Sequence, residues 1–369
     1  MKALILTNNL GEKSGWERYS TDLIDQFIKN DIEAVVICHK KNDNYKGIKQ
    51  LELLPSPLSF KKNYILSFYY FYKFNKINKN LKGFDFVHCF VEPYAFITYL
   101  ISKYLNLKYF LTIHGSYGIK TFHNKIYKFL QLLSYKNAKN ILCVSNYTKS
   151  RVLEYKKLGN IEVIPNGVNL KGFSAIQSGV KKENIIIGVG TLKERKGFDV
   201  MVRAISIVKK SIPDIKYYII GSQKDKGYFN SLTSLIDELD LKNNIFFFEN
   251  LSDDELKNKY QEAKIFSLTP ISDKYNFEGF GLVYLEANAF GLPVIGSCDN
   301  GGEEAIKNSY NGFLTKPNDP SDIAEKIVIL LKDNFLYGNI SANSLLWAKK
   351  LSWNNIIKRY IKVYKNEKN

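Results

Sequence analysis

Residues 265–295, IFSLTPISDKYNFEGFGLVYLEANAFGLPVI, contain the pattern that indicates the fold. An apolar run, Ile265–Leu268, is followed by a loop and then by Leu282–Phe290, which favours a helix that ends at Gly291. The next apolar run, Pro293–Ile295, begins with a proline that prevents the helix from continuing. Apolar runs without polar alternation suit strands buried on both faces, so this stretch predicts a strand, a helix and a parallel strand.

The same rhythm recurs along the whole chain. A first series of apolar runs comprises Ala3–Thr7, Ala34–Cys38, Phe86–Phe90, Tyr109–Ile113, Ile141–Val144 and Glu162–Ile164. A second series comprises Ile185–Val189, Lys216–Ile220, Ile245–Phe248, Ile265–Leu268 and Pro293–Ile295, with helical stretches at Gly197–Ser211 and Ser252–Ala263. The predicted fold class is α/β, with two Rossmann-like parallel-sheet domains.

The chain length also indicates two domains, because 369 residues at about 150 per domain leave room for two cores. Pro165-Asn166-Gly167 and the polar stretch Lys171–Asn184 separate the two series, so we expect domains at residues 1–170 and 171–349. Leu345–Lys365 has apolar residues at spacings of three and four, which predicts one amphipathic helix that could cap the second domain. Parallel α/β domains bind ligands beyond the carboxyl ends of their strands, and a cleft between two such domains is the expected site.

The composition excludes several classes of protein. It is 45% hydrophobic and 24% charged, which is typical of folded chains rather than disordered or fibrous ones. No apolar stretch is long enough for a membrane span, and the N-terminus lacks a signal peptide, so we expect a cytoplasmic protein. The four cysteines are far apart in sequence and are interpreted as core thiols, without structural zinc or disulfides.

Positive charge is concentrated in the first half of the chain. Residues 1–170 carry a net charge of +13 and the rest +4, and no carboxylate occurs between Glu92 and Glu154. Such a field attracts phosphates or an anionic membrane surface. A nucleic-acid binder is disfavoured because no zinc or single-strand-binding motif is present.

Glu278 and Glu286 lie around a loop that leads into the predicted helix at residues 282–290. Gly279 and Gly281 let the backbone approach a ligand closely, and the helix start suits a phosphate. Eight residues of helix separate two side chains by roughly 12 Å, too far for a glycosidase pair. The two carboxylates are better placed to accept hydroxyls from different parts of one elongated ligand.

A second motif, Gly188-Val-Gly-Thr-Leu-Lys-Glu-Arg-Lys-Gly197, follows the first strand of the second series. Glycines beside the paired cations Arg195 and Lys196 suit a diphosphate, because a guanidinium binds two oxygens and an ammonium acts as a point charge. In the first half, His114-Gly115 follows a predicted strand and becomes a further candidate. Gly11–Tyr19 is not a dinucleotide fingerprint, which disfavours a dehydrogenase.

The phrase EGFGLVYLEANAFGLPVI, residues 278–295, resembles the donor site of retaining glycosyltransferases of family 4, which have the GT-B fold. The resemblance implies that Glu278 holds the donor sugar hydroxyls and Glu286 binds the ribose. It also implies that the backbone from Phe280 through Gly281 to Leu282 lies along the sugar and diphosphate.

The other motifs resemble the same family with some departures. The resemblance implies donor binding by Arg195 and Lys196, with Gly190 beside them, although Thr191 stands where an arginine often follows. It implies that His114 contacts the donor from across the cleft. Gly15 matches the second of two glycines that pass the donor phosphate, whereas Ser14 replaces the first.

Two late segments extend this resemblance. Asn300–Ile306 resembles a Gly-Gly and Glu phrase, but a shortened spacer leaves open whether Glu303 or Glu304 matches. The closing helix, about residues 350–369, resembles the one that crosses back to the N-terminal domain. The first domain is then the acceptor domain and the second the nucleotide-sugar donor domain.

The resemblance implies an enzyme that moves a hexosyl group from a nucleotide diphosphate sugar, expected to be UDP-linked, to a sugar, glycan or lipid-linked acceptor with retention of configuration. We expect no metal or other cofactor, because Arg195, Lys196 and the helix start can neutralise the departing diphosphate. The alternatives are a sugar-nucleotide epimerase or a phosphorylase with the same fold, and, more distantly, a non-catalytic membrane-associated scaffold.

One stretch of the first half admits two interpretations. Leu58–Lys82 contains eight aromatic residues, six lysines and no acid. It suits either a helix lying in an anionic membrane interface, peripheral to the inner face of the plasma membrane, or a core helix that covers the sheet and has a lysine-rich outer face.

Overall fold

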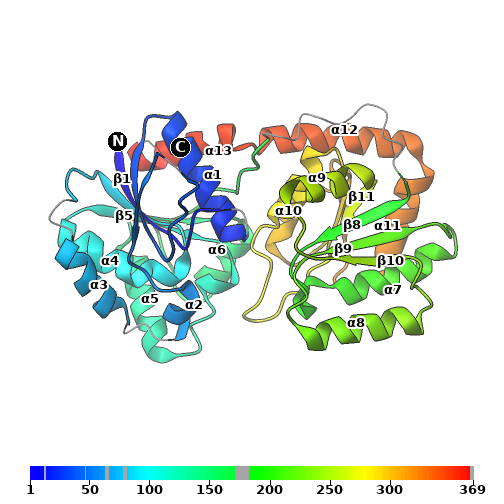
Figure 1. Ribbon diagram of the computed structural model, residues 1–369, viewed down its shortest axis with the longest axis horizontal. Coiled ribbons are helices and arrows are strands. Elements are labelled where there is room, and N and C mark those ends of the chain that lie inside the picture. The colour runs from blue at the N-terminus through cyan, green and yellow to red at the C-terminus, as the bar shows by residue number, and fades with distance from the viewer. Residues whose placement is uncertain (12–13, 46, 63–65, 78–80, 171–182, 366–369) are drawn as a thin grey trace. The chain divides into compact units, whose positions relative to one another are not determined.

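The computed structural model describes the chain except for residues 12–13, 46, 63–65, 78–80, 171–182 and 366–369 (Figure 1). It consists of two compact units. The first comprises Met1–Gly167 together with Trp353–Asn369, and the second comprises Val168–Ser352. The chain therefore passes between the units twice, after Gly167 and after Ser352. Most of the polar stretch Lys171–Asn184, taken above as the linker, lies outside the described residues.

The first unit is built on a seven-stranded parallel sheet of order β3-β2-β1-β4-β5-β6-β7. Its strands are β1 (Lys2–Leu6), β2 (Glu33–Cys38), β3 (Lys49–Glu52), β4 (Phe86–Cys89), β5 (Lys108–Ile113), β6 (Asn140–Cys143) and β7 (Ile161–Val163). In the centre of the sheet, Ile5 pairs with Val36 on one side and His88 on the other. The predicted apolar runs form all the strands of this sheet except β3, a strand that the sequence pattern did not indicate.

Helices cover both faces of this sheet. They are α1 (Gly15–Lys29), α2 (Pro57–Lys62), α3 (Leu66–Ile77), η2 (Glu92–Tyr94), α4 (Ala95–Leu105), η3 (Ser116–Gly118), α5 (Lys125–Asn137), α6 (Asn146–Leu153) and α13 (Trp353–Lys365). Figure 1 shows α13 beside α1, and α4 packs between α3 and α5. Right-handed crossovers place α1 and α4 on opposite faces, since the strand order reverses at β1 and β4.

The second unit has a six-stranded parallel sheet of order β10-β9-β8-β11-β12-β13. Its strands are β8 (Ile185–Val189), β9 (Lys216–Ile220), β10 (Ile245–Phe248), β11 (Ile265–Ser267), β12 (Val294–Ser297) and β13 (Gly312–Thr315). Its helices are η4 (Glu194–Lys196), α7 (Phe198–Lys209), α8 (Lys226–Glu238), α9 (Asp253–Glu262), α10 (Leu282–Ala289), η5 (Gly301–Ala305), α11 (Pro320–Lys332) and α12 (Asn334–Lys350). The α/β class with two parallel sheets is therefore confirmed.

The prediction of one helix over Leu345–Lys365 is wrong. The chain forms α12 up to Lys350 and α13 from Trp353, and the backbone N–H of Val168 donates to the carbonyl of Leu351 at 3.0 Å in the break. The α13 helix packs on the first unit rather than capping the second. The Trp353 Nε1–H donates to Asp22 Oδ2 of α1 at 2.9 Å, inside the protein.

The cysteine prediction holds for three of the four residues. Cys38, Cys89 and Cys143 are buried, whereas Cys298 is partly exposed because it directly follows β12 at the end of the strand. All four are free thiols. Within the described ranges, none of the helices combines the length and apolarity that a transmembrane span needs.

Candidate functional site

Two cations of the second unit converge on one carboxylate oxygen. The Lys196 Nζ lies 2.6 Å from Oε2 of Glu278, and the Arg195 guanidinium approaches the same oxygen at 3.4 Å. These three residues come from loops about eighty positions apart in sequence. The two motifs that the sequence singled out separately therefore form one cluster.

Parallel-strand topology and two glycines bring these loops together. The η4 turn follows β8, and Glu278 lies in the long loop after β11, which is the neighbouring strand. Gly197 has a φ of +68°, and a Cβ there would stand 2.1 Å from the Thr269 carbonyl oxygen. The Arg195 carbonyl accepts a hydrogen bond from the Ile271 N–H at 2.9 Å. The first loop is thus fixed against the start of the second.

The cluster carries one surplus positive charge. Burial of Glu278 opposes its ionisation, but the charges of Lys196 and Arg195 outweigh it, so the pKa of this carboxyl is lowered. Glu278 is therefore ionised at neutral pH, and it offsets one cation of the two. The Arg195 side chain is 36% exposed against 13% for Lys196, so the guanidinium is the more accessible group. Such a cluster suits an anionic ligand with several oxygens.

Closely packed backbone surrounds the start of α10. Gly281 precedes the helix with a φ of +74°, and a Cβ there would stand 2.5 Å from the Tyr284 ring. A Cβ on Gly301 would lie 2.0 Å from the Gly279 carbonyl oxygen. Phe280 is buried, and Leu282 begins the helix in a half-buried position. The predicted helix start and the predicted stop at Gly291, which has a φ of +68°, are both confirmed.

Glu286 and Gly190 lie in different surroundings. Glu286 is buried within α10, where the Tyr260 hydroxyl donates a long hydrogen bond of 3.5 Å to its Oε2. Gly190 lies beside the Lys196 side chain, and a Cβ there would meet Cε of that lysine at 3.7 Å, an ordinary contact. The packing glycine of this segment is instead Gly188, where a Cβ would stand 2.5 Å from the Tyr217 hydroxyl oxygen.

The late Gly-Gly-Glu-Glu segment forms η5. Glu303 accepts from the backbone N–H groups of Asp299 and Asn300, which makes it part of a capping box. Its carboxylate therefore stabilises the turn that brings Gly301 against Gly279.

In the first unit, His114 directly follows β5. Its Nε2 lies 2.8 Å from the Phe90 carbonyl oxygen, and its ring packs edge-on against Tyr19 with centroids 4.4 Å apart. Burial lowers the pKa of His114 to about 4, although the bond to Phe90 acts in the opposite direction. The imidazole is therefore neutral at pH 7 with its proton on Nε2, since a carbonyl accepts only from an N–H. Its Nδ1 can then accept a hydrogen bond.

The buried acid Glu92, which contacts the backbone of His114, was not predicted as a site residue from the sequence. Glu92 lies at the start of η2, and its Oε1 accepts from the His114 backbone N–H at 2.5 Å. Burial raises the pKa of Glu92 to about 7, and hydrogen bonds from the backbone of His114 and Gly115 and from the Trp16 side chain do not offset this effect. The only feature of the sequence that could have indicated Glu92 is its position as a single acid shortly after a predicted strand. This group joins the turn after β5 to the helix that follows β1.

The loop after β1 explains one departure from the expected pattern. Ser14 is the N-cap of α1, has a φ of −142°, and accepts from the Glu17 N–H at 3.3 Å. This backbone conformation does not require glycine, so serine is accommodated. Gly15 begins the helix, and nothing lies within 4 Å of a Cβ built there. Gly15 and His114 both lie beyond the carboxyl ends of strands of the first unit.

Two family profiles match consecutive parts of the chain. Residues 13–171 match Glycosyltransferase Family 4, and residues 173–347 match Glycosyl transferases group 1. The two matches meet within a few residues of the boundary between the structural units.

Individual proteins that are similar to this chain in sequence are also glycosyltransferases by name. An uncharacterized glycosyltransferase of Methanocaldococcus jannaschii is 30% identical over 296 residues, which are 78% of this chain and 78% of that protein. The UDP-Gal:alpha-D-GlcNAc-diphosphoundecaprenol alpha-1,3-galactosyltransferase of Escherichia coli is 28% identical over 271 residues, covering 68% of this chain and 66% of that protein. The crystal structure of Anabaena HepE in complex with UDP is similar in fold, with a TM-score of 0.80 and 17% identity over 99% of this chain and 100% of that one.

Proposed function

Because the chain belongs to glycosyltransferase family 4 and has the GT-B fold, we propose that it is a retaining hexosyltransferase that uses a UDP-linked donor. It transfers the hexosyl group to an acceptor hydroxyl with the α configuration preserved. The observation that carries the proposal is the convergence of Lys196 and Arg195 on Glu278.

In this proposal the second unit holds the donor. Lys196 and Arg195 bind the diphosphate through the surplus charge of the cluster, and Glu278 accepts hydrogen bonds from hydroxyls of the sugar. The backbone from Phe280 to Leu282 lies along the sugar and diphosphate. The buried Glu286 binds the ribose at the other end of the donor. The relative from Escherichia coli supports UDP as the nucleotide, since its name contains a UDP-sugar donor.

In the proposed transfer step, the bond changes and the proton transfer take place between donor and acceptor, and two cations of the protein stabilise the leaving group. The bond between the anomeric carbon and the β-phosphate oxygen breaks while the acceptor oxygen attacks from the same face. The acceptor proton passes to the departing phosphate oxygen, so no side chain acts as nucleophile. Arg195 and Lys196 stabilise the negative charge that develops on the leaving group. These two cations make a metal unnecessary in the proposal. From the first unit, the neutral His114 accepts a donor hydroxyl at Nδ1 and Gly15 lets the phosphate pass the backbone.

The acceptor in this proposal is a lipid-linked sugar, within the broader class of sugar, glycan and lipid-linked acceptors. The name of the Escherichia coli relative contains a lipid-linked acceptor, a diphosphoundecaprenol sugar. The product would belong to cell-surface polysaccharide or glycolipid assembly, and the enzyme would work at the cytoplasmic face of a membrane.

A thermal-shift screen tests the donor assignment. UDP-glucose, UDP-galactose, UDP-N-acetylglucosamine and GDP-mannose are compared, and a ligand at 100 times its Kd stabilises the folded state by about 2.7 kcal/mol. We expect a UDP-sugar to stabilise the protein most. Stabilisation by GDP-mannose alone would overturn the choice of UDP, and stabilisation by none would overturn the donor site.

Product analysis tests the reaction. With the stabilising donor and lipid-linked acceptors, NMR of the product should show an α linkage, and a β linkage would contradict retention. Donor incubated without acceptor, with and without inorganic phosphate, separates transfer from the alternatives. An epimer would identify an epimerase, and a phosphate-dependent sugar phosphate would identify a phosphorylase.

A further inference from the structure

Helix α3 is apolar on two faces. Its inner face buries Ser67 and Phe74. The Phe68 ring meets Phe96 of α4 with centroids 5.5 Å apart, and Phe71 meets Tyr104 at 5.9 Å. These contacts attach α3 to α4, which lies against the sheet. The inner face thus accounts for only part of the aromatic content of α3.

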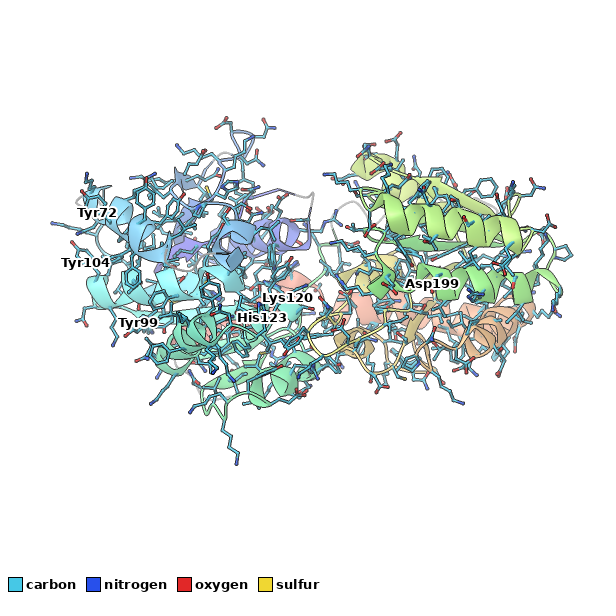
Figure 2. All side chains as sticks on the ribbon, turned by 90° about the horizontal axis from the view of Figure 1, so that it is seen from below. Tyr72, Tyr99, Tyr104, Lys120, His123 and Asp199 are labelled. Carbon is cyan, nitrogen blue, oxygen red and sulfur yellow. The ribbon has the colours of Figure 1, made fainter. Side chains whose placement is uncertain are left out.

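The exposed side of α3 is also aromatic, and it includes the part of the Phe68 ring that α4 leaves uncovered. Phe68, Tyr69 and Tyr72, together with Tyr104 of α4, expose between 50 and 55% of their surface. Figure 2 shows Tyr72 and Tyr104 near Tyr99 along one edge of the first unit. The exposed face of a surface helix is normally polar, so a helix with apolar residues on both faces has a second surface to cover. Four half-exposed aromatic residues leave roughly 400 Å² of surface in water, which is the size of the largest apolar patch on a typical protein, and such a patch is often functional.

Lysines border these rings. The Lys73 Nζ lies 4.8 Å from the centroid of the Tyr69 ring, and the Lys76 Nζ lies 4.6 Å from that of Tyr72. Both lysines are exposed. We call Phe68, Tyr69, Tyr72, Lys73, Lys76 and Tyr104 the aromatic–lysine face.

The sequence places no acid on the helices that carry this face. No aspartate or glutamate occurs between Glu52 and Asp85 or between Glu92 and Glu154, so α3, α4 and α5 contain none. A positive charge without local neutralisation selects an anionic partner. A second copy of this chain is a poor occupant, because the same lysines would face one another across the interface.

We propose that the aromatic–lysine face lies on an anionic lipid bilayer. The rings lie at the level of the headgroups, the lysine stems extend over them, and the ammonium groups meet anionic lipid. This proposal rests on the proposed function and deepens it, because the face brings the first unit to the surface on which a lipid-linked acceptor is presented. It also accounts for the aromatic outer face, which a core helix with only lysines outside would not have.

Vesicle flotation with the full chain tests the proposal. Vesicles of phosphatidylcholine alone are compared with vesicles that also contain phosphatidylglycerol. We expect binding to the phosphatidylglycerol vesicles only, and release by high salt because the attraction is partly electrostatic. Absence of binding to phosphatidylglycerol vesicles would overturn the proposal.

Two sets of variants identify the face. Phe68→Ser with Tyr72→Ser should reduce the bound fraction at least about tenfold, since two interfacial rings are lost. The matched control is Phe335→Ser, which changes a ring of α12 in the second unit that is 80% exposed. Lys73→Gln with Lys76→Gln should weaken binding about fivefold per lysine, with Lys210→Gln of the second unit as control. Variants that float like wild type would contradict the assignment of the face.

Thermal shift with UDP-sugars on the same variants separates this proposal from the proposed function. We expect lost vesicle binding with unchanged donor stabilisation. Vesicle binding without any nucleotide-sugar response would contradict the function and leave the docking face standing. Light scattering completes the test: dimers that dissociate on Phe68→Ser with Tyr72→Ser would assign the face to self-association instead and overturn the bilayer proposal.

Discussion

The backbone N–H of His114 donates a hydrogen bond of 2.5 Å to Oε1 of Glu92, whose residue surface is only 2% exposed. The bond holds the turn after β5 against η2, and the Trp16 side chain of α1 also contacts this carboxyl. A buried acid therefore positions two loops that the proposed function assigns to the donor. Because its pKa lies near 7, its charge changes in the neutral range.

Substitution of Glu92 should change how stability depends on pH. In the folded protein its pKa is about 7 rather than 4.5, so between these values the folded state keeps a proton that the unfolded state has lost. The contribution of Glu92 to stability therefore falls as pH rises through this window. We expect Glu92→Gln to be more stable than wild type above about pH 7, by on the order of 3 kcal/mol. Urea unfolding of both proteins at about pH 5 and about pH 8 measures the difference.

The exposed Glu238→Gln serves as control for this experiment, and it should follow wild type at both pH values. Comparison of variants with wild type at each pH cancels the effect of His114 and His88, whose pKa values are lowered by burial. An equal gap between wild type and Glu92→Gln at both pH values would show that Glu92 does not titrate in this window.

Two neighbouring glycines should respond differently to alanine. Gly197→Ala places a Cβ 2.1 Å from the Thr269 carbonyl oxygen at a φ of +68°, so we expect a loss of about 2 kcal/mol or more in the free energy of unfolding. Gly190→Ala meets only an ordinary contact at 3.7 Å, and we expect a loss below about 1 kcal/mol. Chemical denaturation compares the two. Equal destabilisation would argue against the tight packing described for Gly197.

Glu278→Gln should change UDP affinity and turnover of the UDP-sugar in opposite directions. Removal of the carboxylate leaves two uncompensated cations, so UDP should bind about fivefold more tightly. Turnover of the UDP-sugar should nevertheless fall, because a neutral amide has one acceptor oxygen in place of two and accepts hydrogen bonds from sugar hydroxyls less strongly than a carboxylate. Calorimetric titration with UDP and a donor-turnover assay measure the two effects. Weaker binding of UDP to the variant would contradict the charge balance of the cluster.

Chelation tests the proposal that cations of the protein replace a metal. We expect EDTA to leave donor turnover within about twofold of the untreated enzyme, since Arg195 and Lys196 neutralise the leaving group. The control is a known metal-dependent transferase in the same buffer. Loss of activity on chelation, restored by a divalent cation, would refute the prediction.

The sequence predicted the inner strands of both sheets and one edge strand of each, β7 and β10, but it missed the strand at the opposite edge. Strands that lie between neighbours are buried on both faces and appear as continuous apolar runs. The missed strands, β3 (Lys49–Glu52) and β13 (Gly312–Thr315), are the outermost strands at one edge of each sheet. The first has a charged residue at each end, and the second has only two apolar side chains, Phe313 and Leu314, so neither forms a long apolar run. Their pairing depends on the neighbouring strand, which local pattern does not report.

The break between α12 and α13 has a similar origin. The spacing of apolar residues continues across Leu351 and Ser352, so periodicity favours one helix. The break is accompanied by a contact from Val168, nearly two hundred residues away in sequence. Only the tertiary fold brings that N–H to the Leu351 carbonyl.

The part of the candidate site that lies in recognisable sequence motifs could be predicted from the sequence. Arg195, Lys196 and Glu278 stood out because cations and carboxylates follow strands beside glycines, and the structure places them in contact. Glu92 was not predicted as a site residue, because a single acid forms no motif with other residues at a recognisable spacing. Its raised pKa results from burial beneath His114 and appears only with the fold. The roles of His114, Gly15 and Glu286 toward the donor remain predictions.

Calorimetric titration of wild type, Lys196→Ala and Lys193→Ala with UDP, together with a donor-turnover assay, measures how much Lys196 contributes to donor binding and transfer. Lys193 is an exposed lysine of the same loop and provides the matched control. We expect Lys196→Ala to bind UDP roughly tenfold to a hundredfold more weakly, as loss of a charge-assisted hydrogen bond does, and its barrier to transfer to rise by about 3 kcal/mol. Lys193→Ala should match wild type. Unchanged affinity and turnover in Lys196→Ala would show that Lys196 neither binds the diphosphate nor stabilises the leaving group.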